Sequence, residues 1–387
     1  MISPVDAAEL LSRLVACPSV NPARGKAAGP PFGEGPLTEL LASVLGPWGA
    51  QVRRIEIAPG RFNFIARFEG ADPRRSLLLE THADTVSADG MTVAPFAPAI
   101  RDGRLYGRGS CDAKGPMAAM LLGIREAVAA GGRPPATLHF VATGDEEFGA
   151  TGAHRLMADG FRADAAVVGE PTGLAIVHAH KGAYRFRIVT HGCAAHSSDP
   201  RRGINAIARM ATIVQALEGP LAVRLAAAPA HPVLTPPTVS VGLIRGGTQI
   251  NIVPDRCEIE VDRRTLPGES REAVERQCRE AVASMASTPA APDYDFEPTE
   301  WYPGMEEDPR GPAASVVAAA CEKVLGRAEF RGAPWASNAG IFREAGIPSV
   351  VFGPGFIAQA HTAEEYIDLD QVVRAAAVYA EIIRTFR

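Results

Sequence analysis

The chain has 387 residues, 47% of them hydrophobic, and a formal net charge of −5. This length exceeds what one hydrophobic core usually supports, so we expect two domains. The small negative charge and the lack of any basic run of five or more residues argue against a nucleic-acid partner. The sequence has no stretch of 18 uncharged apolar residues, which argues against a membrane-spanning helix.

The N-terminal segment and the cysteines indicate the compartment. Residues 1–20 mix acidic and apolar residues in the spacing of an amphipathic helix and lack the basic start of a signal peptide. The six cysteines are scattered without a C-x-x-C pair. Neither a disulfide framework nor a thiolate metal site is therefore expected. We expect a cytoplasmic protein.

The first part of the chain alternates helix-like and strand-like segments. In chain order these are helices over 7–16 and 37–49, strands within 62–70 and 75–84, a helix from Lys114, a strand from residue 136, a helix near 150–159 and a strand within 163–172. The strands at 62–70 and 75–84 are expected to be neighbours. A short apolar run at 347–355 then precedes a helix over 369–386. This alternation predicts an α/β fold, with a mostly parallel sheet sandwiched between helices.

The middle of the chain follows a different order. From about residue 180 the segments run strand, helix, strand, strand, helix, strand, which is the β-α-β-β-α-β order of a ferredoxin-like domain. We therefore predict an inserted domain over 180–302. The larger domain would be formed by 1–179 and 303–387.

The stretch "ETHADTV" places two chemically active side chains at the end of an apolar strand. His82 and Asp84 are two residues apart, so on a strand they point to the same face. Open α/β sheets bind ligands at the carboxyl ends of their strands. An acid on this face can accept the second ring N–H of the histidine. Alone, a His-x-Asp pair at a strand end is more often an ordinary loop pair than a site.

Other acids and a second histidine occupy equivalent positions in the sequence. They are Asp145, Glu146, Glu147 and Glu170 after predicted strands, His361 after the 347–355 run, and Asp112 before a helix. Each alone could be a cap, a turn residue or a solvated acid, but together they predict one site. Two histidines with several carboxylates suit zinc, cobalt or manganese. Two ions about 3.5–4 Å apart would need a bridging carboxylate.

These motifs resemble a two-zinc metallopeptidase and deacylase family. The family includes acetylornithine deacetylase, succinyl-diaminopimelate desuccinylase, aminoacylase and glutamate carboxypeptidase. The resemblance covers nearly the whole chain, through "THADTV", "GRLYGRGSCDAKGPMAAM", "GDEEFGATGA", "GEPT", "AHSSDPRRGINAI", "INIVPDRCEIEVDRR" and "FGPGFIAQAHTAEEYI". The last motif looks most like acetylornithine deacetylases. The family resemblance implies a zinc-peptidase-like fold that binds two divalent metal ions per chain. Zinc is the first expectation for these ions, and cobalt is the alternative.

The resemblance also implies a role for each site residue. His82 and Glu170 would hold one metal ion, Glu147 and His361 the other, and Asp112 would bridge them, followed by a cis peptide. Asp84 would orient His82, and Glu146 would be the general base. His196 would stabilise the oxyanion in the site of a partner subunit, and Asn251 and Arg263 would contact the substrate. Without the resemblance, His196 would be interpreted as a surface histidine before a helix.

The expected activity is hydrolysis of the amide of an N-acyl amino acid, first of all acetylornithine-type deacetylation, which would belong to arginine biosynthesis. Desuccinylation or a carboxypeptidase or dipeptidase activity is the alternative on the same scaffold. A non-catalytic binding protein is the alternative from another class. The expected assembly is a homodimer formed through the inserted domain. Thr81 replaces the family's usual glycine, and Ser337–Asn338 replaces its usual Thr-Asp or Thr-Glu near the expected substrate pocket.

Overall fold

The computed structural model describes the chain except for residues 1, 24, 26–28, 129–131 and 286–292. The described residues form two compact units. The larger unit comprises residues 1–179, 306–332 and 337–387, and the smaller unit comprises residues 180–305 and 333–336. The short return of 333–336 to the smaller unit was not part of the sequence prediction.

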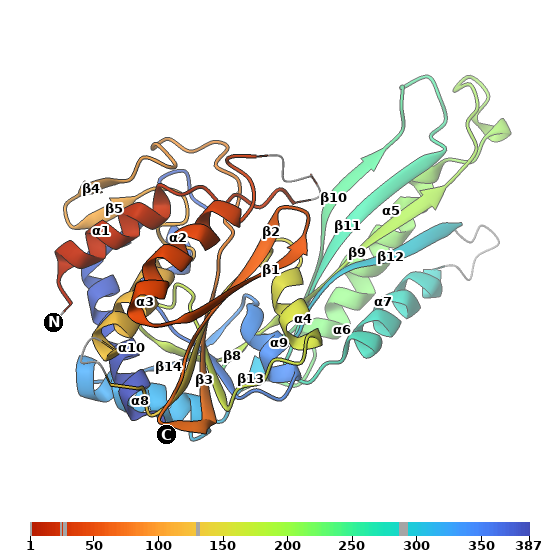
Figure 1. The fold of residues 1–387 in the computed structure, drawn as a ribbon. Coiled ribbons are helices and arrows are strands. Elements are labelled where there is room, and N and C mark those ends of the chain that lie inside the picture. The colour runs from red at the N-terminus through yellow and green to blue at the C-terminus, as the bar shows by residue number, and fades with distance from the viewer. Residues whose placement is uncertain (1, 24, 26–28, 129–131, 286–292) are drawn as a thin grey trace. The chain divides into compact units, whose positions relative to one another are not determined.

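The larger unit is built on a mixed, mostly parallel sheet at its centre (Figure 1). Nine described strands form it in the order β1-β2-β6-β3-β7-β15-β8-β13, with β14 also paired to β8. Their bounds are β1 (Gln51–Ala58), β2 (Arg61–Phe68), β3 (Asp72–His82), β6 (Ala136–Thr143), β7 (Ala165–Val168), β8 (Ile176–His180), β13 (Met305–Glu306), β14 (Phe330–Ala333) and β15 (Ser349–Val351). A separate sheet contains β4 (Ala99–Arg101), β5 (Arg104–Tyr106) and β16 (Tyr366–Asp368).

The prediction that the second and third strands are neighbours is wrong, because β6 lies between β2 and β3. β6 pairs antiparallel with β2 and parallel with β3, where His82 faces Thr143. β3 also pairs in parallel with β7. The carboxyl half of β3 is buried on both faces, as expected for a strand inside a parallel sheet whose two faces are covered by helices.

The helices of the larger unit are α1 (Pro4–Val15), α2 (Gly35–Leu45), η1 (Gly46–Trp48), α3 (Lys114–Val128), α4 (Thr151–Ala158), α8 (Pro312–Leu325), α9 (Asn338–Glu344), η4 (Ile357–Gln359) and α10 (Leu369–Thr385). Of these, α1, α2, α3, α8 and α10 contribute buried side chains to one extended apolar core. α3 and α10 approach closely at Gly123, where an added Cβ would lie 2.7 Å from the Tyr379 Cβ. Because α3 begins only two residues after Asp112, this packing fixes one side of the candidate site.

The smaller unit has the predicted ferredoxin-like order. Its elements are β9 (Gly182–His191), η2 (Pro200–Arg202), α5 (Ala206–Ala216), η3 (Leu217–Leu221), α6 (Ala222–Ala226), β10 (Thr238–Gly246), β11 (Arg256–Thr265), α7 (Arg271–Met285) and β12 (Tyr294–Tyr302). The sheet order is β10-β11-β9-β12 and every pair is antiparallel. α5 and α7 contribute Met210, Ile213 and Cys278 to a core with Phe186 and Val261 from the sheet.

Among the described residues, one continuous helical run, Ala206–Ala226, is long and apolar enough to cross a membrane by length and composition alone. Several of its apolar side chains belong to the small unit's core. Met210, Ile213 and Leu217 are fully buried there. The run therefore packs as a helix on the face of a sheet.

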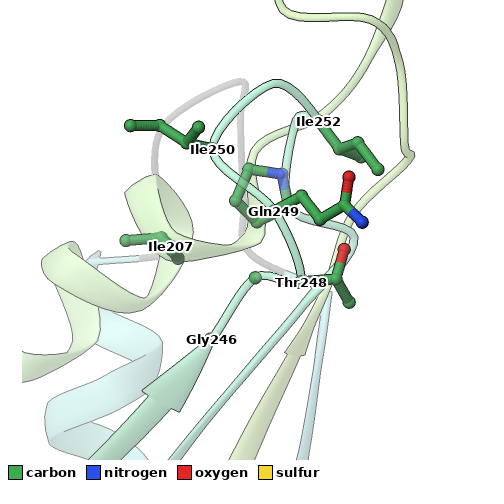
Figure 2. A pocket seen from close by; sticks show the side chains of 8 residues that line it. Ile207, Gly246, Thr248, Gln249, Ile250 and Ile252 are labelled. Atoms are coloured by element: carbon green, nitrogen blue, oxygen red, sulfur yellow. The ribbon is translucent and has the colours of Figure 1, made fainter.

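A shallow pocket of about 370 Å³ lies in the small unit, next to the end of β10. It is lined by Ile207, Gly246, Gly247, Thr248, Gln249, Ile250, Ile252 and Pro254. In Figure 2, Ile207 and Ile250 extend to the same side of the loop. Among the described residues, neither group with metal-ligand geometry includes a residue of this pocket.

Candidate metal centre

The larger unit gathers the predicted acids and histidines at the carboxyl edge of its parallel strands. His82 is the last residue of β3, and Glu170 follows the end of β7 by two residues. Glu146 and Glu147 follow β6. Four neighbouring strands of the sheet, in the order β6, β3, β7 and β15, run parallel to one another. Their carboxyl ends therefore lie at the same edge of the sheet.

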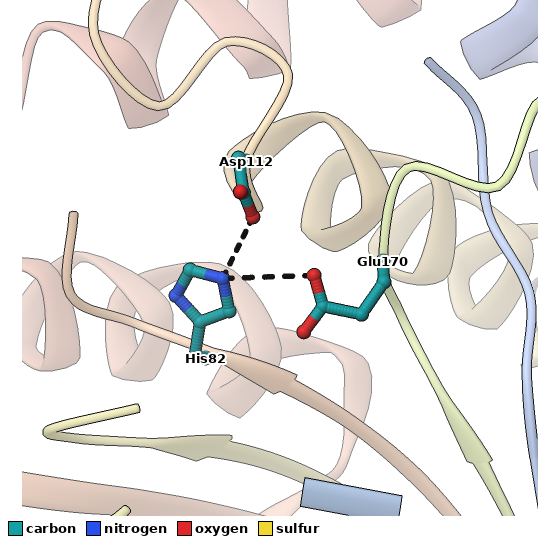
Figure 3. Close-up of side chains that lie close together, drawn as sticks. All are labelled: His82, Asp112 and Glu170. Carbon is teal, nitrogen blue, oxygen red and sulfur yellow. Dashed lines mark hydrogen bonds and ion pairs between the residues drawn. The ribbon is translucent and has the colours of Figure 1, made fainter. Parts of the chain in front are cut away.

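The first candidate ligand group contains His82, Asp112 and Glu170 (Figure 3). The Nε2 atom of His82 lies 2.9 Å from Asp112 Oδ1 and 3.8 Å from Glu170 Oε2. All three side chains are buried. Figure 3 shows Asp112 and Glu170 converging on the same ring nitrogen from two different segments of the chain.

The second group contains Asp112, Glu147 and His361. His361 Nε2 lies 3.3 Å from Asp112 Oδ2 and 3.1 Å from Glu147 Oε1. Asp112 therefore belongs to both groups and turns one carboxylate oxygen toward each histidine. Within each group the potential ligand atoms lie within 4.8 Å of one another. The peptide between Asp112 and Ala113 is cis, as the resemblance implied.

The electrostatics of the cluster match a cation site. Burial raises the pKa of Glu170 and of Glu147, and the nearby carboxylate of Asp112 raises both further. The pKa of His361 is raised to about 10 because its ring donates to Asp112 and Glu147. These three shifts reflect burial together with several carboxylates in a small volume. Two divalent cations would neutralise these carboxylates, and carboxylate with imidazole is a suitable donor set.

Asp84 orients His82 differently from the prediction. The Nδ1 atom of His82 lies 2.8 Å from the main-chain oxygen of Asp84, whereas the Asp84 carboxylate is 3.9 Å from that nitrogen. The carboxylate instead accepts from the backbone N–H groups of Glu146 (3.0 Å) and Glu147 (3.1 Å). The predicted carboxylate contact is therefore wrong. The carboxylate holds the loop of the two glutamates, and the carbonyl fixes the His82 tautomer.

Glu146 lies beside the two ligand groups without belonging to either of them. Its backbone is fixed by Asp84. Burial raises the pKa of Glu146 well above its ordinary value, and the carboxylates of Glu147, Asp84 and Asp112 raise it further, against the opposite effect of His82. A carboxyl group with a raised pKa next to a cation site suits proton transfer.

Glu365 is a supporting residue that the sequence reasoning missed. Its carboxylate accepts hydrogen bonds from the backbone N–H groups of Gly109 (3.0 Å), Cys111 (2.9 Å) and Asp112 (3.0 Å). The Arg108 guanidinium donates to it at 2.7 Å. Glu365 thus fixes the loop that presents Asp112. The only signal in the sequence was the pair of acids that follows His361 in "HTAEEYI".

Asn21 is a second supporting residue without a predicted role. Its Nδ2 donates to Asp84 Oδ2 at 2.7 Å and to Asp145 Oδ1 at 3.0 Å. Arg61 also bonds to Asp145, at 3.2 Å. These bonds tie the loop after β6 to the end of β3.

The residues at 337–338 lie at the start of α9, next to the ends of β3 and β6. Ser337 caps α9, and Asn338 is buried with its Nδ2 donating to Glu80 Oε1 (2.9 Å) and Thr143 Oγ1 (3.0 Å). Asn338 therefore packs inside the larger unit, beneath the end of β3. Thr81, the other departure, is also buried and donates to the Gly169 carbonyl at 3.2 Å.

His196 and Asn251, the two exposed residues of the smaller unit that were predicted to act in catalysis or substrate contact, lie on neighbouring segments. His196 and Ile252 form an isolated antiparallel bridge, and Ser197 N–H donates to the Asn251 carbonyl at 3.0 Å. Both His196 and Asn251 are exposed. The Nδ1 atom of His196 accepts from the Ser198 N–H at 3.2 Å. In a neutral ring the proton therefore lies on Nε2, which is available as a donor.

Arg263 does not suit the predicted role in substrate contact. Its side chain is fully buried, and its Nη2 lies 2.7 Å from Glu269 and 3.1 Å from Gln277. Side chains alternate along β11, so Arg263 faces the helices of the small unit, and Arg264 occupies the opposite face. The predicted substrate contact is therefore wrong for Arg263, which is a structural residue of the small unit's core.

Comparison with known proteins identifies the family. Residues 78–385 match the model of Peptidase family M20/M25/M40. The chain belongs to this family. It is 33% identical over 391 residues to an acetylornithine deacetylase of Proteus mirabilis, covering 98% of this chain and 96% of that protein.

Solved structures show the same fold. Aminopeptidase PepT from Bacillus cereus matches with a TM-score of 0.76 at 24% identity, covering 99% of this chain and 98% of that one. The Bacillus subtilis YXEP protein, described as a dinuclear metal-binding peptidase of the M20 family, matches with a TM-score of 0.71 at 18% identity, covering 98% and 97%. As a member of the M20 family, the chain is a metal-dependent amidohydrolase.

Proposed function

We propose that this M20 protein hydrolyses the amide bond of an N-acyl amino acid with two divalent metal ions, zinc first and cobalt as the alternative. Acetylornithine-type deacetylation is the first activity to test, supported by 33% identity to an acetylornithine deacetylase over nearly the whole chain. The observation that carries the proposal is the position of Asp112, with one oxygen toward each of the two ligand groups.

In this proposal His82 and Glu170 hold one ion, Glu147 and His361 hold the other, and Asp112 is shared. When bound, the ions polarise the amide carbonyl and make water more acidic. Glu146 accepts a proton from the attacking water and transfers it to the leaving nitrogen as the C–N bond breaks. The products are a carboxylate and a free amine. Asp84 keeps Glu146 and Glu147 in place through their backbone N–H groups.

We propose that His196 donates its Nε2–H to the oxyanion that develops on the amide, in the site of a partner subunit. The proposal includes a homodimer formed through the smaller unit. Two features support it: β10 is an edge strand of the small sheet among the described residues, and large apolar side chains are exposed nearby. These are Ile204, Ile207, Leu243, Ile244 and Ile250. Asn251, next to His196, remains a candidate for substrate contact.

One experiment distinguishes the alternative activities. Desuccinylation, and carboxypeptidase or dipeptidase activity, would use the same metal centre. A screen of N-acetyl, N-succinyl and dipeptide substrates, with and without added zinc or cobalt, separates them. Metal-dependent cleavage of an N-acyl amino acid would support the proposal. Binding of these compounds without cleavage, in metal-loaded protein, would favour a non-catalytic binding protein. We expect the enzyme to act in the cytoplasm.

A further inference from the structure

Two large apolar side chains are exposed on the loop that leads to His361. Phe356 is 45% exposed and Ile357 is 46% exposed. Single exposed hydrophobic residues are ordinary on protein surfaces. These two, however, are consecutive and lie only five and four residues before a candidate metal ligand that is itself half exposed. The two residues, here called the Phe356–Ile357 platform, form an exposed apolar surface on the segment that carries His361.

The main chain at Phe356 is fixed by neighbouring loops. Thr172 and Phe356 form an isolated antiparallel bridge, and the Gly173 N–H donates to the Gly355 carbonyl at 2.6 Å. The Cys111 thiol lies 3.5 Å from the Phe356 carbonyl oxygen. Phe356 thus lies where three chain segments meet.

Each of those three segments carries a candidate ligand. Thr172 follows Glu170 by two residues, Cys111 directly precedes Asp112, and the third segment ends in His361. The platform therefore belongs to the rim of the metal centre and not to a distant surface. A substrate whose amide lies at the metal centre would place its other groups within reach of this rim.

The position of the Phe356 ring is set by close packing on Gly173. A Cβ added at Gly173 would lie 2.3 Å from the ring, and Gly173 has a φ of +66°. A residue with a side chain at 173 would displace the ring, so glycine is needed for this arrangement. One side of the ring is held in this way, while almost half of the residue stays open to solvent.

The loop offers no charge to a polar substrate group. Residues 353–360, "GPGFIAQA", contain no acidic or basic side chain. Its single polar side chain, Gln359, turns back to accept from the Phe356 N–H at 3.0 Å. An ammonium or carboxylate group placed against the platform would lose water without gaining a partner. An alkyl or aromatic group would gain from the contact.

We propose that the Phe356–Ile357 platform binds an apolar group of the substrate and makes Phe356 a determinant of specificity. This rests on the proposed function and narrows it: the preferred N-acyl amino acid carries an aliphatic or aromatic group on its side chain or on its acyl chain. The platform discriminates against a charged group of the same size.

Two isosteric substrate pairs test this proposal in zinc-loaded enzyme. N-acetyl-L-norleucine and N-acetyl-L-ornithine differ only in the end of the side chain, and N-(4-methylpentanoyl)-L-alanine and N-succinyl-L-alanine differ only in the end of the acyl chain. We expect kcat/KM to favour the apolar member of at least one pair by about tenfold or more. The pair that shows this preference identifies which side of the amide contacts the platform.

The variant Phe356→Ala should reduce that preference by about tenfold, mainly because kcat/KM for the apolar substrate falls. Phe356→Leu should retain most of it. The ratio of two kcat/KM values from one preparation is independent of the fraction of active enzyme, so partial unfolding does not affect it. Val52→Ala is the control, because Val52 is 40% exposed on the edge strand β1. It should leave both ratios unchanged.

Preference for the charged member in both pairs would overturn the inference and leave the proposed function intact. So would an unchanged ratio in Phe356→Ala, since a purely structural role for the ring would affect both members of a pair equally. If the metal-loaded enzyme cleaves no N-acyl amino acid at all, the proposed function fails, and the inference fails with it.

Discussion

Replacing Glu365 with glutamine perturbs the support of Asp112 without changing the side chain of any candidate ligand. In the structure Glu365 Oε1 accepts from the N–H groups of Cys111 and Asp112, and Oε2 accepts from Arg108 and the Gly109 N–H. Glutamine has one oxygen and one NH₂ group. In either orientation the NH₂ group faces two donors, so two hydrogen bonds are lost.

The expected cost follows from the burial of these groups. The side chains of Glu365 and Arg108 are 1% and 3% exposed, so water cannot replace the lost acceptor. Breaking a buried ion pair costs about 3–5 kcal/mol, and we expect the free energy of unfolding of Glu365→Gln to fall by about that amount. Because the loop that presents Asp112 is loosened, zinc affinity should fall about 10–100-fold.

Two assays check these values separately. Denaturant unfolding of metal-free protein gives the change in stability, and competition against a chromophoric chelator gives zinc affinity. Glu364→Gln is the matched control, because Glu364 is exposed and its loss should change stability by less than about 0.5 kcal/mol. A Glu365→Gln protein with the stability and zinc affinity of the control would refute the reasoning.

Three further predictions concern Glu146, His196 and His180. Glu146→Gln should lower turnover at least about 100-fold with metal content unchanged, as measured by elemental analysis; loss of metal would mean that Glu146 is a ligand. If sedimentation shows a dimer, equal mixing of His196→Ala and Glu146→Gln chains should restore about a quarter of wild-type activity, since half of the dimers are hybrids with one complete site; no recovery would contradict the shared site. Burial lowers the pKa of His180 from its ordinary 6.5 to about 4, so between these pH values the unfolded chain binds the proton and the folded chain does not. The neutral, buried His180 therefore contributes up to about 3 kcal/mol to the free energy of unfolding above pH 6.5, and this contribution is lost as the pH falls toward 4. Unfolding measured across this range should be less pH-dependent in His180→Asn, and an equal slope would contradict the assignment.

The sequence was most informative about residues at the ends of strands. Parallel strands between helices place their carboxyl ends on one edge, so His82, Glu147 and Glu170 could be expected to converge before any coordinates were known. The β-α-β-β-α-β order likewise predicted the smaller unit. Both inferences depend on chain order and hydrophobic pattern, which a single sequence contains.

Features that depend on pairing between distant segments could not be predicted in the same way. Strand order is one example, because nothing in β2 or β3 indicates that β6 separates them. Asp84 is another: its choice between carbonyl and carboxylate contact is decided by the backbone N–H groups of Glu146 and Glu147. For Arg263, alternation along β11 puts two successive arginines on opposite faces, but only the packed helix α7 shows which face is buried.

The most direct test of the account is a crystal structure of the zinc-loaded protein, with anomalous scattering measured on both sides of the zinc absorption edge. We predict two anomalous peaks per chain, about 3.5–4 Å apart. One should lie between His82 and Glu170, the other between Glu147 and His361, with Asp112 contacting both. A single peak, or two peaks that do not share Asp112, would contradict the proposal of a bridged two-metal hydrolase.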